Sequence, residues 1–198
     1  MTEPPTPTQV LDWESRYRDG TARWERGVVN PALTGFLADG TLSPGRILVP
    51  GAGRSPEPLV LARAGFAVVT VDVSPSAVAA QQEQLAGTSG RAELADLFTW
   101  QPEQKLDAIY DQACLCALPP ALLPDYAARL AEWLRPGGVL VELFLQRDSD
   151  GGPPFHCDIA RMRELFPDRL WAWPATVAAP SPASPAGFSE IPTALRRR

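Results

Sequence analysis

The chain has 198 residues, a net charge of −5 and a sequence isoelectric point near 4.9. This length suits one α/β domain that buries a full core. The acidic balance argues against nucleic acid or an anionic membrane as the main partner, so we expect a small-molecule partner.

The cysteines point to free thiols. Cys114, Cys116 and Cys157 are odd in number and lack the paired spacing of a zinc site or a disulfide framework, so we expect no metal. The apolar runs are only strand-length, and residues 1–10 lack a signal-peptide pattern. We therefore expect a cytoplasmic monomer. The arginine-rich composition, with Lys105 as the only lysine, is typical of a GC-rich bacterial genome.

The N-terminal region changes character at residue 9. Residues 1–8 carry three prolines and no apolar period, which predicts a flexible tail before a single domain over 9–198. A helix over 9–18 puts Trp13 and Tyr17 four residues apart on one face, and Trp24 follows after Gly20. This aromatic face is either a packing seam or a cap over a cofactor. A second helix over 31–42 follows, so we take 9–45 as a helical cap.

The stretch over 47–72 organises the chain. An apolar strand over 47–49 is followed by Gly51 and Gly53, whose backbone can turn sharply and let a ligand approach. A helix that Ser55 caps and Gly65 ends should come next, and then a strand over 68–71. These elements predict a nucleotide-binding half-unit, although the glycines of an ordinary βαβ unit could also serve only the turn.

An acid ends this half-unit. Asp72 stands 72 − 53 = 19 residues after Gly53, a spacing at which a carboxylate can accept hydrogen bonds from both ribose hydroxyls of a nucleoside. Pro56 occupies the place of the third small residue of a dinucleotide fingerprint and removes an amide donor. The pattern therefore favours a nucleoside without a pyrophosphate over NAD or FAD, and S-adenosylmethionine is the commonest such ligand of this fold.

The rest of the chain alternates strands and helices. We expect further strands over 91–94, 106–110, 139–145, 170–173 and 188–195, further helices over 75–85, 118–134 and 159–165, and a flexible excursion over 178–185. The fold class is thus α/β, a single doubly wound, mostly parallel seven-stranded sheet flanked by helices.

Polar residues near strand ends are the remaining site candidates. Asp96 with Leu97 can flank an adenine ring, although Asp96 could equally cap a turn. Asp111 and Gln112 follow a strand at the point where such a sheet places its ligand crevice. His156, the only histidine, follows a glycine and proline loop and is either a surface residue or a substrate contact.

Five segments carry a resemblance to a known family: WESRYRDGTARWERG at 13–27, LVPGAGRSPEPLVLARAGFAVVTVDVS at 48–74, DLFTW at 96–100, DAIYDQACLCALPP at 107–120 and GGPPFH at 151–156. Together they resemble the Rossmann-like class I S-adenosylmethionine-dependent methyltransferases of the thiopurine methyltransferase family. The segments DLFTW and GGPPF are closer to its halide/thiol methyltransferase branch.

The resemblance implies roles for the candidate residues. Trp13, Tyr17 and Trp24 would close over the cofactor, Tyr17 standing where the family usually has another tryptophan. The turn with Gly51 and Gly53 would hold the amino-acid part of S-adenosylmethionine. Asp72 would bind the ribose, and Asp96 with Leu97 would flank the adenine. S-adenosylhomocysteine would be the product.

The acceptor is less defined. Where thiopurine enzymes have Arg and halide/thiol enzymes have Tyr, this chain has Gln112, a neutral amide. We expect little fixed positive charge in the pocket, so that a thiol arriving neutral is preferred to a free halide. Asp111, Gln112 and His156 are the candidates for catalysis, and Trp24, Phe155 and His156 for substrate binding. Gln112 is also a candidate for contact with the cofactor. Halide, metalloid, oxygen and nitrogen acceptors, or a non-catalytic binding module, are the alternatives.

Overall fold

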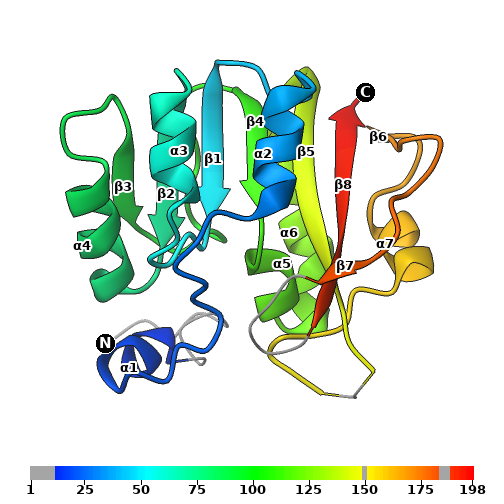
Figure 1. The fold of residues 1–198 in the computed structure, drawn as a ribbon. Helices are drawn as coiled ribbons and strands as arrows, with labels where there is room; N and C mark the ends of the chain where they lie inside the picture. Colours follow the sequence, from blue (N-terminus) through cyan, green and yellow to red (C-terminus); the bar gives the residue numbers. More distant parts are fainter. Residues whose placement is uncertain (1–11, 149–150, 183–187) are drawn as a thin grey trace.

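The computed structural model describes residues 12–148, 151–182 and 188–198, which form a sheet between helical layers (Figure 1). The strands are β1 (Arg46–Pro50), β2 (Ala67–Asp72), β3 (Arg91–Leu94), β4 (Leu106–Asp111), β5 (Leu134–Gln146), β6 (Trp171–Ala172), β7 (Ser181–Pro182) and β8 (Ser189–Arg197). They lie in the order β3-β2-β1-β4-β5-β8-β6, and the short β7 pairs with β8. Strands β1 to β5 are parallel neighbours, and β8 is antiparallel to β5 and β6. The predicted fold class is confirmed.

Helices cover both faces of the sheet. They are α1 (Trp13–Arg18), α2 (Pro31–Ala38), α3 (Glu57–Arg63), α4 (Pro75–Gln84), α5 (Cys114–Ala117), α6 (Leu123–Trp133) and α7 (Ile159–Leu165), with a 3₁₀ turn at Pro120–Leu122. α2 and α3 bury Leu33 and Leu61 against one face, while α5, α6 and α7 pack on the other. Figure 1 shows α1 beyond the carboxyl ends of the parallel strands, next to α4. Every described helix is too short or too polar to span a bilayer.

Local sequence accounts for several helix starts. The Asn30 side chain accepts a hydrogen bond from the Ala32 amide at the start of α2, and Ser74 accepts one from Ala77 at the start of α4. A proline follows each of these caps, where its missing N–H costs no helical hydrogen bond. The Asp158 side chain caps α7 in the same way.

Four expectations about local structure were wrong. Ser55 caps no helix: α3 begins at Glu57 without a side-chain cap. The helix expected over 118–134 is broken, because Leu118 precedes a proline and is extended, with φ −83° and ψ 139°. The helix expected over 31–42 ends at Ala38. Part of the excursion expected over 178–185 pairs with β8 as β7. The expected tail over 1–8 lies outside the described residues.

Candidate active site

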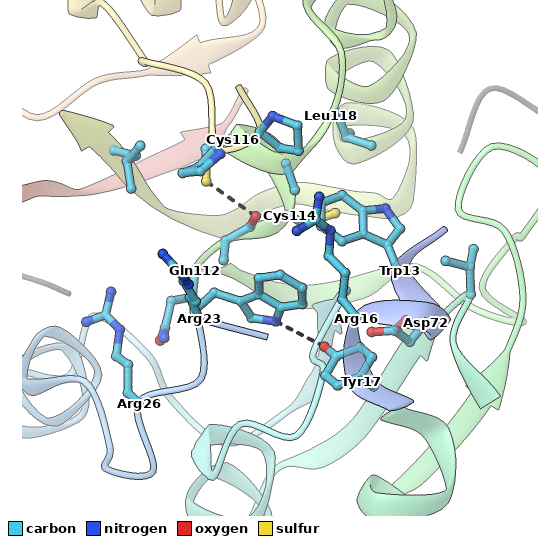
Figure 2. Close-up of a pocket in the computed structure, with 18 of the residues that line it drawn as sticks. Trp13, Arg16, Tyr17, Arg23, Arg26, Asp72, Gln112, Cys114, Cys116 and Leu118 are labelled. Carbon is cyan, nitrogen blue, oxygen red and sulfur yellow. Dashed lines mark hydrogen bonds between the residues drawn. The ribbon is translucent and has the colours of Figure 1, made fainter. Parts of the chain in front are cut away.

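A cavity of about 1090 Å³ opens along the edge where the parallel strands end (Figure 2). Gly51 follows β1, Asp72 ends β2 and Gln112 follows β4, and all three line it. Leu145 near the end of β5 and Glu190 near the start of the antiparallel β8 line it as well. The volume is that of a ligand pocket, with room for a nucleoside and a small acceptor.

The glycine turn lies under the N-terminal cap. Gly51 and Gly53 have φ values of +53° and +55°, a conformation that other residues rarely adopt. A Cβ atom added at Gly53 would lie 2.5 Å from the Tyr17 hydroxyl oxygen, and one at Gly51 would lie 3.3 Å from Cys114. A side chain at position 53 would therefore clash with the Tyr17 hydroxyl, and glycine avoids this clash.

Asp72 is held by the backbone at the end of β2. Its Oδ2 accepts a hydrogen bond from the Gly53 amide at 3.0 Å and its Oδ1 accepts one from the Ser74 amide at 2.9 Å. Burial raises the pKa of Asp72, and these backbone hydrogen bonds oppose the shift. Each oxygen keeps acceptor capacity for a ribose hydroxyl, so the residues present fit the cofactor that the sequence implies.

The three N-terminal aromatics form one cluster on the cavity wall. The rings of Trp13 and Trp24 meet edge to face with centroids 5.4 Å apart, and those of Tyr17 and Trp24 do so at 5.6 Å. The Tyr17 hydroxyl accepts a hydrogen bond from Trp24 Nε1 at 3.1 Å, dashed in Figure 2. The structure thus brings together the residues that the sequence predicted as a cap.

Glu14 fastens this cap to the domain. Its carboxylate accepts hydrogen bonds from the Ser74 hydroxyl at 2.5 Å, the Ser76 hydroxyl at 2.6 Å and the Ser76 amide at 3.0 Å. These bonds, led by that from the Ser74 side chain, lower the pKa of Glu14 to about 2. A carboxylate at the start of α4 also suits the helix dipole.

Of the two residues predicted to flank the adenine, one lines the cavity and the other does not. Ala95 and Leu97 line the cavity, whereas Asp96 is not among its lining residues. The Asp96 carboxylate accepts a hydrogen bond from the Phe98 amide at 2.8 Å, the geometry of a turn.

Asp111 and Gln112 face different surroundings. Asp111 is buried behind the cavity wall, where it accepts hydrogen bonds from the Tyr126 hydroxyl at 2.7 Å and the Cys114 amide at 2.8 Å. Burial raises the pKa of Asp111 to about 6. Gln112 lines the cavity, and its Oε1 accepts a hydrogen bond from the Tyr110 hydroxyl at 3.1 Å.

The GGPPFH segment meets the cavity through its prolines. Pro153 and Pro154 are lining residues, whereas Phe155 and His156 are not. The Phe155 amide donates to the Cys116 carbonyl at 2.6 Å, which ties the segment to α5. His156 is exposed, and its Nδ1 accepts a hydrogen bond from the Arg147 amide at 3.3 Å.

Two of the cysteines also line the cavity. Cys114 and Cys116 are free and buried, and burial raises the pKa of each thiol well above its ordinary value. They therefore stay protonated and are poor nucleophiles. Among the described residues no cluster of His, Cys, Asp and Glu side chains is arranged to hold a metal ion.

The expectation of little positive charge in the pocket is wrong. Arg16, Arg23, Arg26 and Arg147 line the cavity, and Figure 2 shows Arg23 and Arg26 near Gln112 in this view. Residues 107–120, around Gln112, contain no arginine or lysine, so the local sequence gives no sign of this charge. The arginines reach the cavity from the N-terminal region and from the residue after β5.

Sequence reasoning also missed Glu14 and Glu190. Glu14 follows Trp13, so its place on the same helix was a usable signal. Glu190 lies at the start of the last strand, and only the antiparallel pairing of β8 with β5 brings that start to the ligand edge.

Comparison with known proteins decides the family. The model of the thiopurine S-methyltransferase family matches residues 8–174. The chain belongs to the thiopurine S-methyltransferase family. Membership in this family makes it an S-adenosylmethionine-dependent methyltransferase, which agrees with the Asp72 and glycine-turn geometry.

Relatives of the thiopurine S-methyltransferase family come from both of its branches. Thiocyanate methyltransferase 1 of Arabidopsis thaliana is 32% identical over 178 residues, covering 82% of this chain and 78% of that protein. Thiopurine S-methyltransferase of Legionella pneumophila strain Corby is 32% identical over 163 residues, covering 72% and 74%. Magnesium protoporphyrin IX methyltransferase from Synechocystis, solved with S-adenosylhomocysteine, shares the fold at a TM-score of 0.72, with 22% identity over 96% of this chain and 99% of that one.

Proposed function

We propose that this family member transfers the methyl group of S-adenosylmethionine to the sulfur of a small thiol, sulfide or thiopurine. The observation that carries the proposal is one cavity that joins Asp72, Gly51 and the aromatic cap to a second region beside Gln112 and β8. Relatives named as thiopurine and thiocyanate methyltransferases support it.

Residues of β1, β2 and the cap hold the cofactor in this proposal. The Asp72 carboxylate binds the ribose hydroxyls, the turn at Gly51 and Gly53 holds the amino-acid part, and Leu97 flanks the adenine, with Asp96 holding the turn next to Leu97. Trp13, Tyr17 and Trp24 close over it and exclude water. The bound cofactor supplies a methyl group on a positively charged sulfur.

Residues at the other end of the cavity orient the acceptor. We assign Gln112 to direct contact, because its amide lines the cavity and Tyr110 fixes its orientation. Trp24 forms the apolar wall. Three other residues act without touching the acceptor in this proposal. Asp111 holds the start of α5, and His156 and Phe155 position the loop behind Pro153.

A second candidate is methylation of a halide or a small pseudohalide anion. Arg16, Arg23 and Arg147 favour it, because fixed positive charge offsets the dehydration of an anion, whereas the charge of Arg26 is paired with Glu190. The same arginines would attract hydrosulfide or a thiolate.

An acceptor series tests the proposal. Labelled S-adenosylmethionine is offered with hydrosulfide, small organic thiols, a thiopurine, iodide, thiocyanate, and oxygen and nitrogen acceptors, and kcat/KM is measured for each between pH 7 and 9. We expect a sulfur acceptor to give the highest value. Faster turnover of iodide than of every sulfur acceptor at matched ionic strength would move the protein to the halide class.

We also propose that the protein acts as a monomer in the bacterial cytoplasm. The three free cysteines support a reducing compartment. Size-exclusion chromatography with light scattering tests the oligomeric state.

A further inference from the structure

We propose that Glu190 is the base that takes the proton of a thiol acceptor, with Arg26 and Asn30 holding its carboxylate in place. The inference rests on the proposed function, because a thiol carries a proton that must leave, whereas a halide acceptor carries none and needs no base.

Glu190 lies at the end of the cavity that the cofactor residues leave open. It pairs with Leu145 across β5 and β8, and both line the cavity. Asp72 ends β2, and β1, β4 and β5 lie between β2 and β8 in the sheet. A nucleoside held by Asp72 therefore leaves the space over β5 and β8 for the acceptor.

Two neighbours orient the Glu190 carboxylate. Arg26 Nη2 donates to Oε1, and Asn30 Nδ2 donates to Oε2 at 3.0 Å. The residue is only 3% exposed, yet it lines the cavity. Each oxygen uses one lone pair in these bonds and keeps another, so the carboxylate can still accept a proton.

The other candidate bases are placed less well. Among the described lining residues the acids are Asp72 and Glu190. Asp72 is committed to the turn and to the cofactor in our proposal. Asp111 and His156 are not lining residues. Glu190 is therefore the described carboxylate at the acceptor end.

The charges around Glu190 set its proton affinity. Burial raises the pKa of Glu190 to about 7, and the negative charge of Glu57 in α3 adds to the rise. The Arg26 guanidinium and the Asn30 hydrogen bond oppose it by lowering the pKa. Burial keeps the Tyr110 hydroxyl and the Cys116 thiol neutral, and the negative charge of Glu190 adds to the rise in the pKa of each. A base that titrates near neutral pH suits proton abstraction from a thiol.

The S–H bond of the acceptor breaks, its electron pair stays on sulfur, and the proton forms an O–H bond on Glu190. The sulfur pair then forms the bond to the methyl carbon as the bond from that carbon to the donor sulfur breaks. Glu190 returns the proton to solvent, so each turnover releases one proton.

The test compares two sulfur acceptors that differ in their proton. An alkyl thiol is mostly protonated at pH 7.5, whereas an electron-poor aryl thiol is already ionised. We expect Glu190→Gln to lower kcat/KM for the alkyl thiol by about 100-fold or more and to change that for the aryl thiol by less than about threefold. Glu142→Gln is the matched control, because it removes a buried carboxylate of β5 outside the cavity lining; it should leave the ratio of the two values unchanged.

The pH profile gives a second readout. With two alkyl thiols of different pKa, the acid limb of kcat/KM in the native protein should stay near pH 7 for both, in line with the pKa of about 7 at Glu190. In Glu190→Gln the limb should move to the pKa of each thiol. Arg26→Gln should shift the midpoint of the acid limb upward by about one pH unit, because the carboxylate of Glu190 loses a positive neighbour. This variant tests the base role if Glu190→Gln does not fold.

A measurement without turnover completes the test. Infrared titration of the protein alone should show a protonated-carboxyl band with a midpoint near pH 7 that Glu190→Gln lacks and Glu142→Gln retains. Equal losses on both thiols, limbs that follow the thiol in the native protein, or no such band would overturn the base role alone. Failure of the native protein to methylate any thiol would overturn the proposed function as well.

Discussion

A Cβ atom at Gly53 would lie 2.5 Å from the hydroxyl oxygen of Tyr17. The absent side chain at one position thus makes room for the side chain at the other, and Tyr17 is buried there. This fit joins the glycine turn after β1 to the aromatic cap. We infer that the turn serves the cap as well as the ligand.

Gly53→Ala should separate these roles. At φ +55° an alanine costs about 1–2 kcal/mol of stability, and the clash should also displace Tyr17 and weaken S-adenosylhomocysteine binding by about tenfold or more. Gly87→Ala is the control, because Gly87 has φ +78° with nothing within 4 Å of an added Cβ. Calorimetry and thermal unfolding measure both variants. Equal affinity in the two would show that the clash does not reach the site.

Asp72→Ala should mainly weaken cofactor binding. The ribose hydroxyls would lose charge-assisted hydrogen bonds, so we expect S-adenosylhomocysteine affinity to fall by about 10- to 100-fold. Titration calorimetry measures this, with thermal unfolding to confirm that the variant is folded. Unchanged affinity would mean that Asp72 only supports the turn through the Gly53 and Ser74 amides.

Glu14→Ala should loosen the cap without unfolding the sheet. The variant leaves the Ser74 and Ser76 hydroxyls without their carboxylate partner, so we expect faster proteolysis near α1 and weaker S-adenosylhomocysteine binding. Glu83→Ala, an exposed change on α4, is the control. Identical cleavage of the two variants would contradict the role of Glu14.

The same contact has a pH dependence. The pKa of Glu14 is lowered to about 2 from its ordinary 4.5. A lowered acid pKa stabilises the contact above the ordinary value and loses that contribution as the pH falls through the lowered one. Protection of α1 from acid-active protease should therefore persist at pH 5 and decline toward pH 2 in the native protein.

Glu142 should make the protein less stable as the pH rises. It is buried beside Asp111 in the β4–β5 pairing, and its Oε1 has no hydrogen-bond partner among the described residues. Burial, and then the negative charge of Asp111, raises the pKa of Glu142 well above its ordinary value. A raised acid pKa means that the folded state holds the proton more tightly, so its stability falls as the pH rises.

Glu142→Gln removes this titration. We expect the variant to match the native protein at pH 5 and to exceed it at pH 8 by about 1–2 kcal/mol, or roughly 2–8 °C in Tm. Glu83→Gln on the surface should show no such difference. A gain of the same size at both pH values would point to packing and would contradict the account.

Much of the sheet could be predicted because its strands are apolar runs between turn residues. The strand expected over 106–110 is observed as Leu106–Asp111, and the helix over 159–165 is observed as expected. The prediction of a helix starting at Leu118 was wrong. The apolar spacing of the segment is helical, but Pro119 disfavours a helical conformation for the residue before it. Pattern alone does not weigh that local restraint.

Part of the candidate site could also be predicted from the sequence, for a different reason. Gly51 follows β1 and Asp72 ends β2 of one half-unit, so chain order alone brings them together. Arg26 meets Glu190 across 164 residues, a contact that depends on the direction of β8 and on the path of the cap. Such contacts follow from tertiary packing and carry no local pattern.

A crystal structure of the complex with S-adenosylhomocysteine tests the central claim most directly, namely that one cavity holds the cofactor at Asp72 and leaves the acceptor end at Glu190. We predict ribose hydroxyls within about 3 Å of the Asp72 carboxylate, adenine against Leu97, and the cofactor sulfur directed toward the space beside Gln112 and Glu190. A ligand bound outside this cavity, or a ribose without contact to Asp72, would contradict the account.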